Sequence, residues 1–175
     1  GTELVFSFTT LKLQALFLRD SGKLRFRNLS IDYDPLPYTQ GTLTSLSADG
    51  LEVGFSIHAG YPDFAGRYVV MRAYAFDPAS RRWKKGVSDL YPRSIEALGP
   101  RAGRFSLGTV EPKLAVGDLL AFTTRLGSAF SSYGCSNLRI EDVTVYTAPS
   151  IAVTVRFPTG LDNYFRFKVL RGPKP

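Results

Sequence analysis

Two carboxylates separated by a single residue, Asp32 and Asp34, are the first candidates for chemistry in this chain of 175 residues. Alternate residues of an extended segment point to the same side, so the two carboxyl groups would share a face. Hydrolysis of a glycosidic bond usually needs two carboxyl groups, one acting as acid and one as base or nucleophile. Asp34 precedes Pro35, however, where Asp commonly starts a turn. A turn role therefore stands beside a substrate-binding role.

Aromatic and amide side chains follow these carboxylates, at Tyr33, Tyr38 and Gln40. Aromatic rings stack on apolar faces, and amides both donate and accept hydrogen bonds. A second polar group, Asp162 and Asn163, follows a Pro-Thr-Gly turn. We predict that both groups contact substrate. Packing and turn formation are the alternatives for each.

A basic cluster surrounds the single tryptophan, Trp83, and consists of Arg81, Arg82, Lys84 and Lys85. One interpretation is a solvated hairpin tip, since charge runs usually face water. The other is a contact to an anionic group, with Trp83 as a stacking platform for substrate. The net charge of +7 permits a polyanion partner. Because the remaining basic residues are dispersed, we do not expect nucleic acid.

Several kinds of site are excluded by composition. Cys135 and His58 are the only cysteine and histidine, so a Cys/His zinc site and an internal disulfide are ruled out. No motif supports nucleophilic catalysis through His58. We therefore expect no metal and no cofactor. No apolar run is long enough to cross a membrane, so no membrane partner is expected. Cys135 is predicted to be a small buried residue.

Three segments repeat one apolar pattern and predict how the candidate residues are positioned. Leu24–Ile31 aligns with Leu138–Val145 at an offset of 114 residues, and Tyr164–Val169 follows at an offset of 24. Apolar alternation indicates strands, and a fixed period of this size indicates stacked repeats. The pattern predicts coils of a parallel β-solenoid.

The alignment also predicts which side chains stack. Ile31, Val145 and Val169 should form one internal ladder of the core. Tyr164 aligns with Ile140, which places the tyrosine ring at a core position.

The large offset between the first two segments indicates an insertion. Strand-like segments separated by turns predict an antiparallel β-barrel-like domain at 41–125. Coils of the β-helix would then occupy 1–40 and resume at 126–175.

Within the insertion, Asp49-Gly50 lies between two alternating segments, which is a strong hairpin signal. One short helical turn is predicted at 94–100, because Gly99-Pro100 would stop a helix there. Gln40 and Arg125 should lie close together, because an insertion must return to the coil it left.

Two stretches, Asn28–Thr42 and Asn137–Pro149, resemble sequences of secreted right-handed parallel β-helix proteins. The resemblance is closest to bacterial α-1,3-galactosidases, glycoside hydrolases whose β-helix carries an inserted β-barrel. Gly117–Leu120 resembles the strand that leaves that barrel. The resemblance implies an all-β fold, a partial right-handed parallel β-helix interrupted by an antiparallel β-barrel-like insertion. It also implies a secreted or periplasmic location.

The same resemblance implies a function. In such proteins further coils carry the acidic active site, so we expect this chain to belong to a larger β-helix chain, with its catalytic acids mostly outside. The leading hypothesis is a module of a galactosidase-like enzyme acting on galactose-containing glycans, inactive by itself. The alternative is a non-catalytic glycan-binding β-protein. Binding of a polyanion through charge alone is the third.

Overall fold

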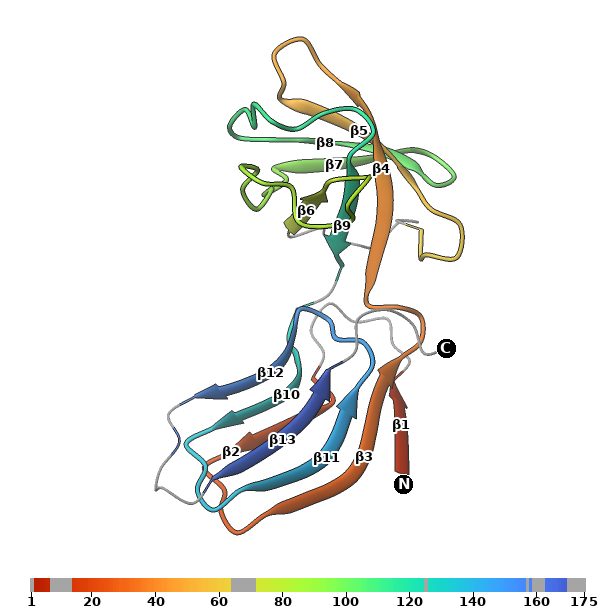
Figure 1. The fold of residues 1–175 in the computed structure, drawn as a ribbon. Helices are drawn as coiled ribbons and strands as arrows, with labels where there is room; N and C mark the ends of the chain where they lie inside the picture. The colour runs from red at the N-terminus through yellow and green to blue at the C-terminus, as the bar shows by residue number, and fades with distance from the viewer. Residues whose placement is uncertain are drawn as a thin grey trace. The chain divides into compact units, whose positions relative to one another are not determined.

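The computed structural model describes residues 2–6, 14–63, 72–124, 126–156, 158 and 163–169. These residues form strands of parallel and antiparallel sheets and no helix, which confirms the all-β prediction (Figure 1). The chain divides into two compact units. The parallel unit comprises Gly1–Pro37 with Leu126–Pro175, and the antiparallel unit comprises Tyr38–Arg125.

The parallel unit contains two sheets in which every neighbouring pair of strands is parallel. The chain visits them alternately, so that each strand of one sheet is followed by a strand of the other, on both sides of the inserted unit (Figure 1). The first sheet has the order β1 (Thr2–Phe6), β3 (Arg25–Tyr33), β11 (Arg139–Val145), β13 (Tyr164–Val169). The second has the order β12 (Ile151–Arg156), β10 (Ser128–Tyr133), β2 (Leu16–Arg19).

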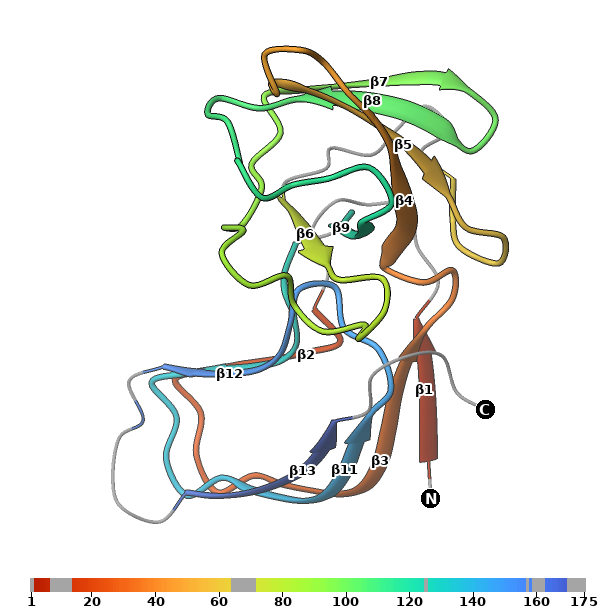
Figure 2. The same ribbon diagram turned by 45° about the horizontal axis from the view of Figure 1, so that its top comes forward.

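These two sheets face each other across an apolar core and form two separate layers (Figure 2). Phe130 on β10 and Phe167 on β13 meet with ring centroids 5.4 Å apart. Ile31 and Val145 are fully buried in the same core. Their inward positions alternate with outward polar ones, which is the pattern that the sequence repeat predicts.

The predicted ladder is confirmed in register. Val145 pairs with Ile31 on one side and with Val169 on the other. Val169 nevertheless keeps 51% of its surface exposed, because no described strand covers the outer side of β13.

The predicted core position of Tyr164 is wrong. Tyr164 pairs with Arg139 and is 46% exposed, whereas Phe165 pairs with Ile140. The cause is a bulge in β11 at Asp142, whose φ is 53°. Between the pairs Ile140–Phe165 and Val143–Phe167, β11 contains one more residue than β13. An offset of 24, which pairs Val145 with Val169, therefore assigns Ile140 to Tyr164 instead of to its actual partner Phe165.

The antiparallel unit is one six-stranded sheet around its own apolar core. Its centre is formed by Phe55, Phe105 and Phe122, whose ring centroids lie between 4.8 and 6.0 Å apart. The sheet has the order β6 (Arg72–Phe76), β9 (Leu119–Thr123), β4 (Tyr38–Leu46), β5 (Glu52–Ile57), β8 (Ala102–Ser106), β7 (Ser94–Gly99).

The helical turn predicted at 94–100 is wrong, because Ser94–Gly99 form strand β7. This segment pairs with β8 in an antiparallel hairpin, and Arg101 at φ 57° makes the turn between them. The hydrogen bonds to β8 replace those that a single helical turn would make, and one isolated turn is itself a costly nucleus.

The two ends of the antiparallel unit are side by side, since Tyr38 on β4 pairs with Thr123 on β9. Arg125, which the sequence placed beside Gln40, lies outside the described residues.

An ion pair fixes the loop that carries the basic cluster. Lys84 Nζ lies 2.5 Å from Asp118 Oδ1, and Asp118 Oδ2 accepts a hydrogen bond from the backbone N–H of Ala115 at 2.8 Å. The Asp118 side chain is 3% exposed and that of Lys84 20%. Lys84 therefore stabilises the antiparallel unit by pairing with the buried Asp118 carboxylate.

Replacing Lys84 by Met should destabilise the antiparallel unit by about 3 kcal/mol, because Asp118 would keep a buried charge without its partner. Urea denaturation followed by tryptophan fluorescence measures the change. The exposed neighbour Lys85 is the control, and Lys85→Met should change the free energy of unfolding by less than about 0.5 kcal/mol. Equal losses in the two variants would contradict the structural role of the pair.

Replacing Val145 by Ala should destabilise the parallel unit by about 2 kcal/mol, since it removes buried methyl groups from a closed core. Val169→Ala, one strand away in the same ladder, should cost less than about 0.5 kcal/mol because Val169 is half exposed. Thermal and chemical denaturation of both variants checks the difference. A larger effect at Val169 would mean that the outer side of β13 is covered in solution.

Candidate functional site

The predicted carboxylate pair lies at the end of β3. Asp32 Oδ1 accepts hydrogen bonds from Thr147 Oγ1 and from the backbone N–H of Tyr33, each at 2.8 Å. Asp34 is exposed in the segment after the strand, where its bond to Pro35 is cis. Asp32 thus ties β3 to the turn after β11, and the pair differs in environment, with one carboxylate bonded and one solvated.

Tyr33 is buried among the core residues of the parallel unit and is 3% exposed. Its ring offers no face for stacking on a ligand. Burial raises the pKa of the Tyr33 phenol to about 12, and this outweighs the opposite effect of a hydrogen bond with the backbone of Ala15.

Tyr38 and Gln40 belong to β4 of the antiparallel unit. The rings of Tyr38 and Tyr61 have centroids 6.2 Å apart. Gln40 lines a cavity of about 510 Å³ together with His58, Tyr61 and Arg81. His58 Nε2 is hydrogen-bonded to Thr42 Oγ1 at 2.8 Å, which fixes the imidazole against the sheet.

Trp83 is 48% exposed, and its ring packs against Tyr74 at 5.1 Å and Phe76 at 6.0 Å between centroids. Its Nε1–H donates to the carbonyl of Val87 at 3.2 Å. The indole is therefore held rigidly, with about half of its surface facing solvent.

The second predicted polar group is only partly described. Asp162 lies outside the described residues. Asn163 Oδ1 accepts a hydrogen bond from the backbone N–H of Leu138 at 2.9 Å, in the turn that leads into β13. Its amide oxygen thus joins consecutive strands of one sheet.

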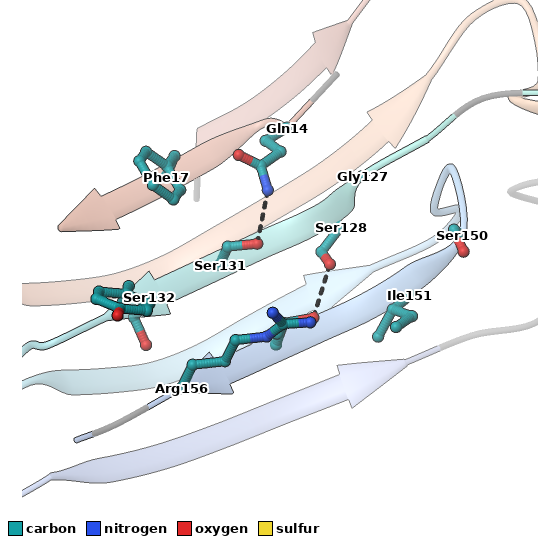
Figure 3. Close-up of a pocket in the computed structure, with 11 residues that line it drawn as sticks. Gln14, Phe17, Gly127, Ser128, Ser131, Ser132, Ser150, Ile151 and Arg156 are labelled. Atoms are coloured by element: carbon teal, nitrogen blue, oxygen red, sulfur yellow. Dashed lines mark hydrogen bonds between the residues drawn. The ribbon is translucent and has the colours of Figure 1, made fainter. Parts of the chain in front are cut away.

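A cavity of about 350 Å³ lies instead on the outward side of the β12-β10-β2 sheet (Figure 3). We call this surface the hydroxyl face, because five of its lining side chains are Ser or Thr. Its described lining residues are Gln14, Phe17, Gly127, Ser128, Ser131, Ser132, Tyr133, Ser150, Ile151, Thr154 and Arg156.

The in-register parallel pairing of three strands builds this surface. Phe17, Ser131 and Thr154 form one row across β2, β10 and β12. The next outward row is Arg19, Tyr133 and Arg156. Neighbouring strands lie about 4.8 Å apart, so each row is a short ladder of fixed spacing.

The hydroxyl groups are held by their neighbours. Ser128 Oγ and Thr154 Oγ1 are hydrogen-bonded at 2.7 Å, and Gln14 Nε2 donates to Ser131 Oγ at 2.9 Å (Figure 3). A hydroxyl has one donor and two acceptor positions, so each group retains capacity for a further bond. Ser128 and Ser131 are each 6% exposed, so only a ligand seated in the cavity can reach them.

Aromatic rings flank the hydroxyls. Phe17 is 55% exposed and Tyr133 39%. The described residues of the cavity include no Asp, Glu or His, so the hydroxyl face offers hydrogen bonds, aromatic faces and one arginine, with no acid or base for hydrolysis.

Sequence reasoning missed this surface, although a signal was present. The offset of 114 that aligns Leu24 with Leu138 also aligns Phe17 with Ser131 and Arg19 with Tyr133. Extending this offset upstream of Leu24 would have predicted the pairs of β2 with β10, whereas Thr154 and Arg156 of β12 lie at an offset of 23 from their partners, one less than the repeat gives. Ser and Thr residues do not by themselves indicate a site in a sequence. Here they lie together only because strands that are far apart in the sequence pair with one another.

Among the described residues, no three His, Cys, Asp or Glu side chains gather in a way that could hold a metal ion. The described part of the chain also contains no helix able to cross a bilayer. Cys135 is buried as predicted, at 2% exposure, and its Sγ–H donates to the carbonyl of Tyr133.

Comparison with known protein families and with curated proteins gives no match for this sequence.

The raised pKa of Tyr33 predicts how stability depends on pH. The folded state keeps the phenol neutral up to about pH 12, whereas the unfolded chain ionises near pH 10.0. The free energy of unfolding that the neutral phenol contributes is therefore fully present below pH 10. It is lost as the pH rises from 10 to about 12, by up to about 2–3 kcal/mol. Urea denaturation at points across the interval measures the loss.

Tyr33→Phe should flatten this alkaline loss, because Phe has no proton to release. Tyr164→Phe, at a half-exposed position of the same unit, serves as the control and should leave the loss as in the parent chain. If the two variants lose stability alike above pH 10, burial of Tyr33 is not its source.

Proposed function

We propose that this chain is a carbohydrate-binding module of a secreted carbohydrate-active protein, and that the hydroxyl face binds its glycan. The single observation that carries the proposal is the Phe17–Ser131–Thr154 row, in which an exposed ring stands beside two fixed hydroxyls over a cavity. Sugars present both apolar C–H faces and hydroxyl groups. A surface that pairs an aromatic face with oriented hydrogen-bonding groups matches both.

The architecture supports an extended ligand. We propose that the fold is a right-handed parallel β-helix interrupted by a barrel-like insertion, and the two facing parallel sheets that the chain visits alternately support this proposal. From Ser128 to Tyr133 the hydroxyl face runs roughly 16 Å along the strand. That length accommodates several linked sugars laid along β10.

The resemblance of Asn28–Thr42 and Asn137–Pro149 to α-1,3-galactosidases supports galactose-containing glycans as the first ligands to test. Related folds host hydrolases, lyases and proteins without catalytic activity, so the resemblance alone does not assign a reaction. Because the hydroxyl face holds no described carboxylate, we assign binding to it and place hydrolysis, if the protein performs it, on acids elsewhere.

Isothermal titration with galactose-containing oligosaccharides tests the proposal. Phe17→Ala should weaken binding about threefold to tenfold, since the stacking face is lost while the strand remains. Tyr91→Ala is the matched control, because Tyr91 is equally exposed, at 55%, but lies in the antiparallel unit. It should leave the affinity unchanged.

Two outcomes would contradict this assignment. Binding that survives Phe17→Ala but disappears in Trp83→Ala would place the site on the indole of the antiparallel unit. Absence of binding to every neutral and acidic oligosaccharide would exclude a glycan module. Circular dichroism of each variant establishes that the sheets are intact.

A further inference from the structure

The row next to the hydroxyls contains two arginines on either side of an aromatic ring. Arg19 on β2 and Arg156 on β12 both pair with Tyr133 on β10, so the three side chains stand on adjacent strands. At about 4.8 Å per strand, the two arginine positions are roughly 10 Å apart. At about one Debye length, the repulsion between two exposed guanidinium groups is weak at physiological salt, so both arginines can be charged on this face.

The two arginines differ in their partners. The Arg19 guanidinium lies over the Tyr133 ring, 5.5 Å from its centroid, and its Nε is 3.5 Å from Asp20 Oδ2. Its charge is therefore already balanced within the turn that follows β2. Arg156 forms no ion pair with any described residue, and it lines the cavity.

The Arg156 side chain extends toward the hydroxyl groups of the cavity (Figure 3). Figure 3 shows its side chain extending back along β12 toward the Ser128–Thr154 end of the cavity. The guanidinium is thus offered beside the hydroxyls, where a sugar bound to them would lie. A planar guanidinium donates two parallel hydrogen bonds to a carboxylate or a sulfate, and these charge-assisted bonds are stronger than any pair that the uncharged hydroxyls of a neutral sugar accept.

We propose that the glycan bound by the hydroxyl face is acidic, and that Arg156 selects it by binding a carboxylate or sulfate group on the sugar. This inference rests on the proposed function, because it concerns the same cavity. It adds the class of ligand, an anionic sugar, and the residue that recognises its charge. The ring of Tyr133 stacks beside that sugar, while Arg19 and Asp20 hold the ring in place.

The experiment compares matched oligosaccharides that differ only in charge. A uronic-acid oligosaccharide, its carboxyl-reduced neutral counterpart and the sulfated form of that counterpart are titrated into the whole chain by calorimetry. The acidic ligands should bind at least about tenfold more tightly than the neutral one, in keeping with the strength of charge-assisted hydrogen bonds. The two acidic arms show which anion the site prefers.

Arg156→Gln should remove this preference, weakening the acidic ligands about tenfold while leaving the neutral one unchanged. Arg139→Gln removes the same charge from an exposed position of β11 in the other sheet and is the control. It should change neither affinity. A comparable loss in both variants would show attraction by diffuse positive charge and overturn the assignment to Arg156.

Failure of this inference is distinguishable from failure of the proposed function. If the neutral oligosaccharide binds as tightly as the acidic ones and Phe17→Ala weakens both, the glycan site stands and its selectivity for acid is refuted. If none of the three ligands binds, both proposals are refuted.

Discussion

The parallel pairing of β3 with β11 is the interaction on which the rest of the structure depends. It joins two segments separated by the entire antiparallel unit, and its register brings Ile31 onto Val145 in a fully buried position. A slip of β11 by one residue against β3 would turn the apolar side chains of β11 outward, so burial itself specifies the register. Asn28 and Asp142, with φ of 54° and 53°, occupy the same register position of the two strands, so both strands leave the extended conformation at the same place.

The same register builds the hydroxyl face on the second sheet. β2 and β10 repeat the offset of β3 and β11, so a ladder fixed by core residues on one sheet also aligns Phe17 with Ser131 on the other. The apolar positions of the core determine the pairing of the strands, so outward positions such as Phe17 and Arg156 are less constrained by the fold.

The sequence predicted the parts of this structure that repeat or alternate. The ladder through Val145, the inserted antiparallel strands and the burial of Cys135 all follow from apolar period and turn residues. Tyr164 was misplaced because a bulge adds a residue without any apolar signal. The strand at Ser94–Gly99 was missed because its partner β8 decides its conformation. The hydroxyl face was missed for a related reason: Ser131 and Thr154 lie beside Phe17 only because distant strands pair, and local sequence does not show that pairing. Trp83, which stood out by its chemistry, is held by Tyr74, Phe76 and Val87 within its own unit.

The pairing of Tyr38 with Thr123 has a consequence for the order of folding. Contacts between β3 and β11 require closure of a loop that contains the whole antiparallel unit, and the entropy cost of closure grows with loop length. Once the antiparallel unit has folded, its two ends are already adjacent, and the effective loop between β3 and β11 shortens to residues 34–37 and 124–138. Chain synthesis also delivers that unit before β11 emerges. Folding of the antiparallel unit first would thus lower the entropy cost of pairing β3 with β11, so that a topology dominated by distant contacts can assemble from local ones.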